Sequence, residues 1–171
     1  MTETPRSDGS GGFLRAAVTA WALAGGGLLV AVIVVNVLSV IGGAVLGRPF
    51  PGDFEITEIG IAVAVFAFLP YCQMSDANVT ADVFTSRAGP RLRAVLGLAA
   101  SATALAFSAL LVWRMWFGLL DQKLYGYTTA ILQFPHWIAF ASILASLGLL
   151  AAASTMTLVR DARDMASAGA R

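Results

Sequence analysis

Long apolar runs separated by short polar stretches dominate the pattern along this chain. Four runs reach the length of about 20 apolar residues that a helix needs to cross the hydrocarbon layer of a membrane, and they cover about 17–41, 56–74, 92–116 and 135–159. The stretches between the runs carry turn-forming residues and charges. The pattern therefore predicts an all-α integral membrane bundle of four transmembrane helices, with tails at 1–16 and 160–171.

The distribution of basic residues predicts the orientation of this bundle. Eight arginines lie in the N-terminal tail, in the loop between the second and third runs, and in the C-terminal tail: Arg6, Arg15, Arg87, Arg91, Arg93, Arg160, Arg163 and Arg171. The first and third loops carry three basic residues: Arg48, Arg114 and Lys123. Because cytoplasmic segments carry the excess of lysine and arginine, we expect both termini in the cytoplasm. The first run is longer than the apolar core of a signal peptide, so we expect it to stay in place as a membrane anchor.

Aromatic residues support the same orientation. Five of them cluster at the predicted outer ends of the third and fourth runs: Trp113, Trp116, Tyr125, Tyr127 and Trp137. Amphipathic rings favour the boundary between lipid and water. We therefore expect these residues to be interfacial anchors.

Composition narrows the class of protein further. The chain is 58% hydrophobic and only 12% charged, whereas a soluble domain has about 25% charged residues. A net charge of +1 gives no electrostatic basis for binding nucleic acid. One cysteine and one histidine exclude an internal disulfide, a cysteine metal cluster and a haem held between two histidines. We therefore expect membrane lipids as surroundings, and no cofactor.

The middle of every predicted span lacks ionisable side chains. The first run offers only Asn36 as a strongly polar residue, and the third and fourth runs offer only hydroxyl groups at depth. A proton relay in a membrane protein needs carboxylates or histidines there, and an ion site at a broken helix needs a central break. The sequence therefore predicts a chain that supports a solute carrier and does not move the solute itself.

Five polar residues are candidates for contact with such a partner: Glu55, Glu58, Asp82, Arg114 and Asn36. Glu55 and Glu58 follow a predicted N-cap at Asp53, so they either stabilise the positive end of the helix dipole or meet a partner. Asp82 is either a solvated loop acid or part of a short interfacial helix. A catalytic pair of glutamates has the least support, because no nucleophile, metal ligand or other base accompanies it.

Five stretches of the chain together resemble a known family. They are Asn36-Val37, the FEITE that opens the second run, FAFLPYCQ at its end, the segment 78–84 (NVTADVF), and TTAILQFPHWIAF before the last run. In this order they resemble the small membrane subunit (DctQ-like) of tripartite ATP-independent periplasmic (TRAP) transporters over roughly residues 15–160. The chain departs from the family at Asn78, where histidine is common, and after Asn36, where an arginine–aromatic pair is common.

The resemblance implies a set of partners and a location. A larger DctM-like membrane subunit would hold the substrate and sodium sites, and a periplasmic substrate-binding protein would deliver the solute. This chain would then be a non-enzymatic scaffold in the bacterial inner membrane. Two alternatives from other classes remain, namely a membrane anchor subunit of a redox complex and a stand-alone small four-span transporter.

Overall fold

The computed structural model describes residues 9–75 and 90–169, and this part of the chain is built of helices without a strand. The helices are α1 (Gly9–Leu46), α2 (Asp53–Met74), α4 (Pro90–Tyr125) and α5 (His136–Gly169). Each contains a stretch that is long and apolar enough to cross a membrane. The predicted all-α class with four membrane-crossing helices is confirmed, and the chain is a multi-pass membrane protein.

All four helices are longer than the apolar runs that predict them, and α2 exceeds its run only by the three residues at its start. The 38 residues of α1 correspond to a length of about 57 Å, against about 30 Å of hydrocarbon. The third helix was expected to end near Trp116, but α4 continues to Tyr125. The polar residues at 121–123 are compatible with a helix, and the chain turns only at Gly126, which has a φ of 63°.

Two glycines with positive φ shape the connection between α1 and α2. Gly47 follows the last residue of α1 with a φ of 68°, a conformation in which a side chain is strained. Gly52 precedes α2 with a φ of 84°. A Cβ atom at Gly52 would also come within 2.6 Å of Leu132 Cγ. Glycine at position 52 therefore lets the α4–α5 connection pack against the start of α2.

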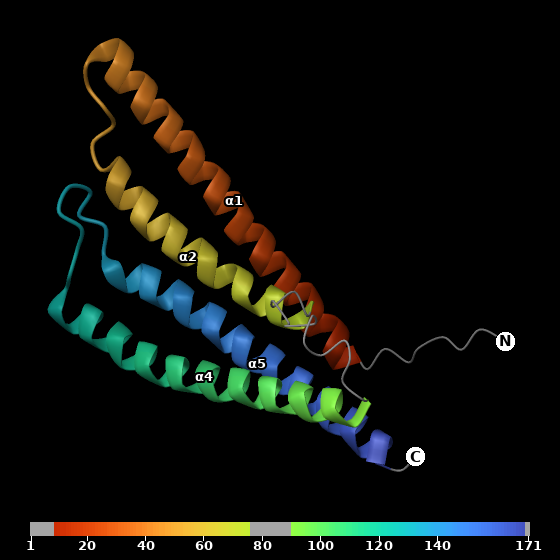
Figure 1. Ribbon diagram of the computed structural model, residues 1–171. Coiled ribbons are helices and arrows are strands. Elements are labelled where there is room, and N and C mark those ends of the chain that lie inside the picture. The colour runs from red at the N-terminus through yellow and green to blue at the C-terminus, as the bar shows by residue number, and fades with distance from the viewer. Residues whose placement is uncertain (1–8, 76–89, 170–171) are drawn as a thin grey trace.

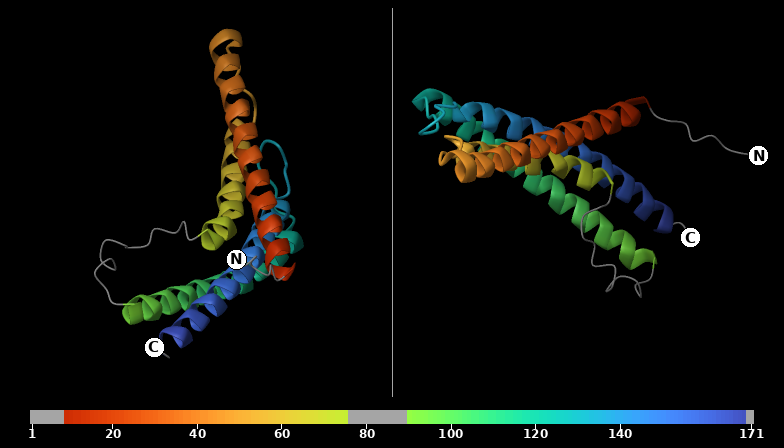
Figure 2. Two further views of the ribbon diagram at one scale, coloured as in Figure 1. Left: turned by 90° about the vertical axis from the view of Figure 1, so that its right-hand side faces the viewer. Right: turned by 90° about the horizontal axis from the view of Figure 1, so that it is seen from above.

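The four helices form two antiparallel hairpins, α1–α2 and α4–α5 (Figure 1). The hairpins meet mainly through α2 and α5, so that α1 and α4 lie on the outside of the array. Figure 2 shows that the two hairpins diverge from one another and do not close into a compact bundle. The α1–α2 and α4–α5 connections lie at one end, called the loop end here. The start of α1 and the end of α5 lie at the opposite end, called the terminal end.

Small residues allow α1 and α2 to approach closely. Gly25 lies so near α2 that an added Cβ would be 2.7 Å from Ala67 Cβ, and Gly60 of α2 lies against Val32 of α1. Ala64 and Ala67 are buried along the same side of α2. Because apolar side chains gain little from leaving lipid for protein, close backbone approach of this type is a main source of helix association in membranes.

Hydroxyl and amide groups join the two hairpins. Trp21 Nε1 of α1 donates to Ser146 Oγ of α5 over 2.8 Å, and Gln73 Nε2 of α2 donates to Thr157 Oγ1 of α5 over 3.2 Å. Hydrogen bonds between transmembrane helices contribute modestly, about 0.6 kcal/mol on average. They therefore fix the register of α5 against the first hairpin more than they determine overall stability.

Candidate functional site

The loop end gathers most of the polar candidates, and several of them hold the chain to itself. Asn36 Nδ2 donates to Thr57 Oγ1 of α2 over 2.7 Å and to Val32 O of its own helix over 2.9 Å. Thr57 Oγ1 in turn donates to Asp53 O over 2.7 Å. The amide of Asn36 is thus used as a tie between α1 and α2. Its predicted contact with a partner stays a prediction.

Asp53 joins the end of α1 to the start of α2. Ser39 Oγ, which is buried, donates to Asp53 Oδ2 over 2.5 Å and accepts from the Phe50 amide over 3.0 Å. The prediction that Asp53 is the N-cap of α2 was wrong, because the capping position is Gly52 and Asp53 is the first helical residue. Its carboxylate faces Ser39 because the left-handed Gly52 turns the chain one residue earlier than the sequence pattern suggested.

Glu55 holds the α4–α5 connection in place. Its Oε1 accepts the amide of Ile131 over 2.7 Å, and its Oε2 accepts the amide of Leu132 over 2.9 Å. Both oxygens are therefore used by a segment about 76 positions further along the chain. The dipole and the partner interpretations of Glu55 both left out this contact, because no local pattern relates residues so distant in sequence.

Glu58 lies on another side of α2. Its side chain is exposed, and no hydrogen bond or ion pair joins it to any other residue that the structure describes. It follows Phe54 by four residues and precedes Ile61 and Val65 along one exposed stripe of the helix. Residues with this spacing share one helix face. Glu58 is thus a single carboxylate within an apolar face, which we call the α2 stripe (Phe54, Glu58, Ile61, Val65).

Arg114 lies within a helix and not in a loop. It precedes the end of α4 at Tyr125 by eleven residues, which is about 16 Å along the helix axis. Its side chain is exposed among exposed apolar neighbours that include Leu110, Leu111 and Phe117. The sequence placed Arg114 beside a span end because the apolar run was expected to stop at Trp116. An arginine on an apolar helix face is costly in lipid and is a candidate for pairing with a partner.

The predicted anchors form two groups at different distances from the loop end. Tyr125 and Tyr127 lie with ring centroids 5.8 Å apart at the α4–α5 connection, and Lys123 Nζ lies 5.8 Å from the ring centroid of Trp137. Trp113 packs edge-on against Phe117 with ring centroids 5.7 Å apart, further along α4 from the loop end. Trp116, like the other four, is exposed. Their role as interfacial anchors stays a prediction.

Comparison with protein families gives a match over most of the chain. Residues 29–164 match the DctQ component of tripartite ATP-independent periplasmic transporters. The chain belongs to this DctQ family. Comparison with curated proteins and with solved structures finds no match. The matched range includes the polar ties at the loop end, the α2 stripe and Arg114.

As a DctQ component, the chain is one part of a transporter, and its described residues contain no group of three or more histidine, cysteine, aspartate or glutamate side chains that could hold a metal ion. Asp82 lies outside the described residues.

Sequence reasoning missed Ser39, Thr57 and the buried serines of the helix contacts. Serine and threonine in an apolar run are common, so only the contact itself distinguishes a hydroxyl that joins helices from one that bonds its own backbone.

Proposed function

We propose that this chain is the small permease subunit of a sodium-coupled TRAP-type solute importer in the bacterial inner membrane. It acts there as a stationary scaffold for a larger DctM-like membrane subunit, which carries the substrate and ion sites. A periplasmic substrate-binding protein delivers the solute to that subunit. The observation that carries this proposal is the match of residues 29–164 to the DctQ component.

The open arrangement of the helices supports a scaffold role. With α1 and α4 on the outside of the array, each helix offers an apolar face that the chain itself does not cover. Exposed apolar residues of α1 include Ile33, Leu38 and Val40, and those of α4 include Phe107 and Leu110. Such faces suit lipid on one side and a membrane partner on the other.

The ties at the loop end support the same role. Ser39, Asp53 and Asn36 fix α1 to α2, and Glu55 fixes α2 to the α4–α5 connection. A subunit that resists the movement of its neighbour must hold its own hairpins together. These hydrogen bonds join both hairpins at the end where each of them turns.

We assign the contact with the large subunit to the α2 stripe and to the α4 face around Arg114. Glu58 and Arg114 are exposed charges on apolar helix faces, and a charge in this setting is stabilised by an opposite charge on a partner. The large subunit should therefore present a basic group to Glu58 and an acidic group to Arg114.

Co-purification of the two membrane subunits tests this interface. We expect Glu58→Lys and Arg114→Glu each to lower the recovery of the large subunit, because each change places like charges together in a low-dielectric contact. Asp121→Lys is the matched control for Glu58→Lys. Asp121 is also an exposed carboxylate, but it lies close to the end of α4 and should be screened by water. Equal recovery with all three variants would contradict the assignment of this interface.

Uptake in proteoliposomes tests the function as a whole. The chain alone should move no solute along or against a sodium gradient. Uptake should require the large subunit, the binding protein and this chain together, and omission of this chain should leave solute binding by the binding protein unchanged. Sodium-driven uptake by the chain alone, or full uptake without it, would refute the scaffold proposal.

A further inference from the structure

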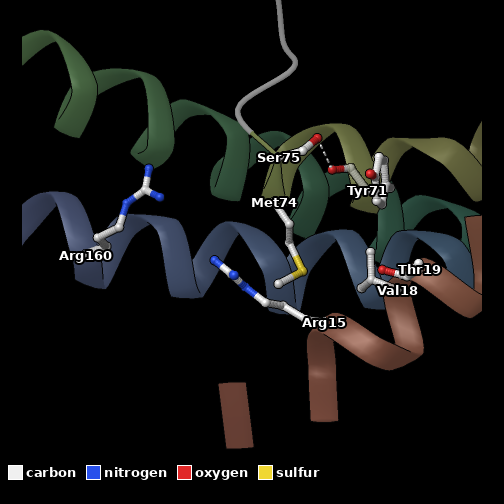
Figure 3. Close-up of a pocket in the computed structure, with 7 residues that line it drawn as sticks. All are labelled: Arg15, Val18, Thr19, Tyr71, Met74, Ser75 and Arg160. Carbon is white, nitrogen blue, oxygen red and sulfur yellow. Dashed lines mark hydrogen bonds between the residues drawn. The ribbon is translucent and has the colours of Figure 1, made fainter. Parts of the chain in front are cut away.

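A basic cavity lies at the terminal end, between the start of α1 and the ends of α2 and α5. It is open and encloses about 350 Å³. Arg15 of α1 and Arg160 of α5 line it together with the hydroxyl-bearing residues Thr19, Tyr71 and Ser75 (Figure 3). Two arginines from helices at opposite ends of the chain therefore line one cavity, which neither the scaffold role nor the loop-end contacts explain.

Arg15 and Arg160 are the charged residues among the described residues that line the cavity. Arg160 Nε lies 3.6 Å from Asp161 Oδ1, so Asp161 offsets part of one arginine charge. Asp161 does not line the cavity, and among the described residues no other carboxylate does. Ser75 Oγ already donates to Tyr71 O over 2.7 Å, so its proton is used within the helix and is not offered to a ligand. The N–H groups of the two arginines are the charged donors that line the cavity, and they suit an anion that accepts hydrogen bonds.

The position of the cavity along the helices indicates which anion fits. The membrane-crossing stretches of the three helices are Gly12–Leu46, Asp53–Met74 and His136–Arg163, so the cavity lies where all three approach the membrane surface. Val18 and Met74 give it an apolar wall, as Figure 3 shows beside Arg15. A ligand with a charged head and an apolar tail matches both parts of this lining.

We propose that this cavity binds the phosphate of an anionic phospholipid, with Arg15 and Arg160 as the phosphate-binding residues. Arginine binds phosphate oxygens through two parallel N–H groups. With both termini in the cytoplasm, as the distribution of basic residues predicts, the cavity faces the cytoplasm, where anionic lipids attract basic residues close to membrane-crossing helices. Val18 and Met74 then lie beside the first carbons of an acyl chain. This proposal rests on the membrane placement of the chain and not on its pairing with a large subunit, so lipid retention and co-purification can fail independently.

Lipid retention by the full chain tests this proposal. The chain is purified from membranes in a mild detergent, offered phosphatidylglycerol and phosphatidylcholine at equal concentration, and examined by native mass spectrometry. Phosphatidylglycerol should be retained in preference to phosphatidylcholine. Removal of one arginine charge should reduce its retention about 5-fold, and Arg15→Gln together with Arg160→Gln should reduce it about 30-fold. Arg163→Gln is the matched control, because Arg163 is exposed on the same helix but does not line the cavity.

A second pair of changes separates phosphate binding from folding. Lysine at both positions keeps the charge but loses the bidentate geometry, so it should retain phosphatidylglycerol more strongly than the glutamine pair and less strongly than the unchanged chain. If the glutamine pair does not fold, Arg15→Gln alone must still lower retention. The proposal is overturned by equal retention of the two lipids, by an equal loss with Arg163→Gln, or by displacement of the lipid with millimolar inorganic phosphate, which would indicate a free phosphate site.

Discussion

Replacement of Gly25 by alanine tests how closely α1 and α2 pack. The added Cβ would lie 2.7 Å from Ala67 Cβ and 3.4 Å from Ala64 O, whereas two carbon atoms in contact prefer about 3.5–4.0 Å. The helices would have to separate by about 1 Å at this point, and a gap of that size loses a quarter to a half of the contact energy of each atom pair around it. Overpacking of this kind costs about 1–3 kcal/mol.

Gly27→Ala provides the matched control for this change. Gly27 lies two residues further along α1, and nothing lies within 4 Å of an added Cβ there. Both substitutions replace a helical glycine by alanine and gain about 1 kcal/mol of helix propensity. The difference between the two variants therefore isolates the packing cost, and we expect Gly25→Ala to be less stable than Gly27→Ala by about 1–3 kcal/mol.

Unfolding of the purified chain in mixed micelles with increasing sodium dodecyl sulfate, followed by circular dichroism, measures this difference. Ala67→Gly removes the carbon atom that the new Cβ meets. In the Gly25→Ala background, Ala67→Gly should therefore lower the free energy of unfolding by less than it does in the unchanged chain, where the loss of helix propensity is about 1 kcal/mol. Equal stability of the Gly25 and Gly27 variants, or strictly additive effects of the two changes at 25 and 67, would refute the close contact between α1 and α2.

Three further measurements test other parts of the structure. Thr57→Val removes the acceptor of the Asn36 amide and should lower stability by about 0.6 kcal/mol in the same unfolding assay; no loss would show that the tie does not contribute. Glu55→Gln weakens an acceptor shared by two amides of the α4–α5 connection, so hydrogen exchange at those amides should become faster while exchange in the middle of α5 stays the same. Single cysteines can be introduced at Pro51 and Ala166 in a chain whose native cysteine has been replaced. In intact spheroplasts, an impermeant thiol reagent should label the cysteine at position 51 and leave the one at position 166 unlabelled; labelling at 166 would contradict the expected orientation.

The fold class was predictable from the sequence because the bilayer imposes a simple rule. A run of about 20 apolar residues can satisfy its backbone in lipid only as a helix, so the number and order of the membrane-crossing helices follow from composition along the chain. The ends of the helices did not follow in the same way. The third apolar run weakens near Trp116, but α4 continues to Tyr125, because residues 117–125 are compatible with a helix whether lipid or water surrounds them.

The candidate site was predictable in its residue types and not in its contacts. Glu55 and Glu58 are three residues apart and look equivalent in sequence, yet Glu55 binds two amides of the α4–α5 connection and Glu58 is exposed on the α2 stripe. A separation of three residues places the two side chains about 60° apart around a helix. That difference directs one carboxylate toward the second hairpin and leaves the other outside it.

The sequence by itself determined that the chain crosses a membrane four times, which residues are expected to face the cytoplasm, and which family the chain resembles. These properties depend on the local partition of residues between lipid and water, and each stretch of the chain expresses them independently. Only the tertiary structure decided that α2 and α5 form the middle of the array, that Gly25 meets Ala67, and that Arg15 and Arg160 line one cavity. These contacts join residues far apart in the chain. Because an apolar side chain is about as stable in lipid as against another helix, the hydrophobic pattern does not determine which helix faces pack together. The selection is made by shape and by the few hydrogen bonds between helices, which exist only once the helices have packed.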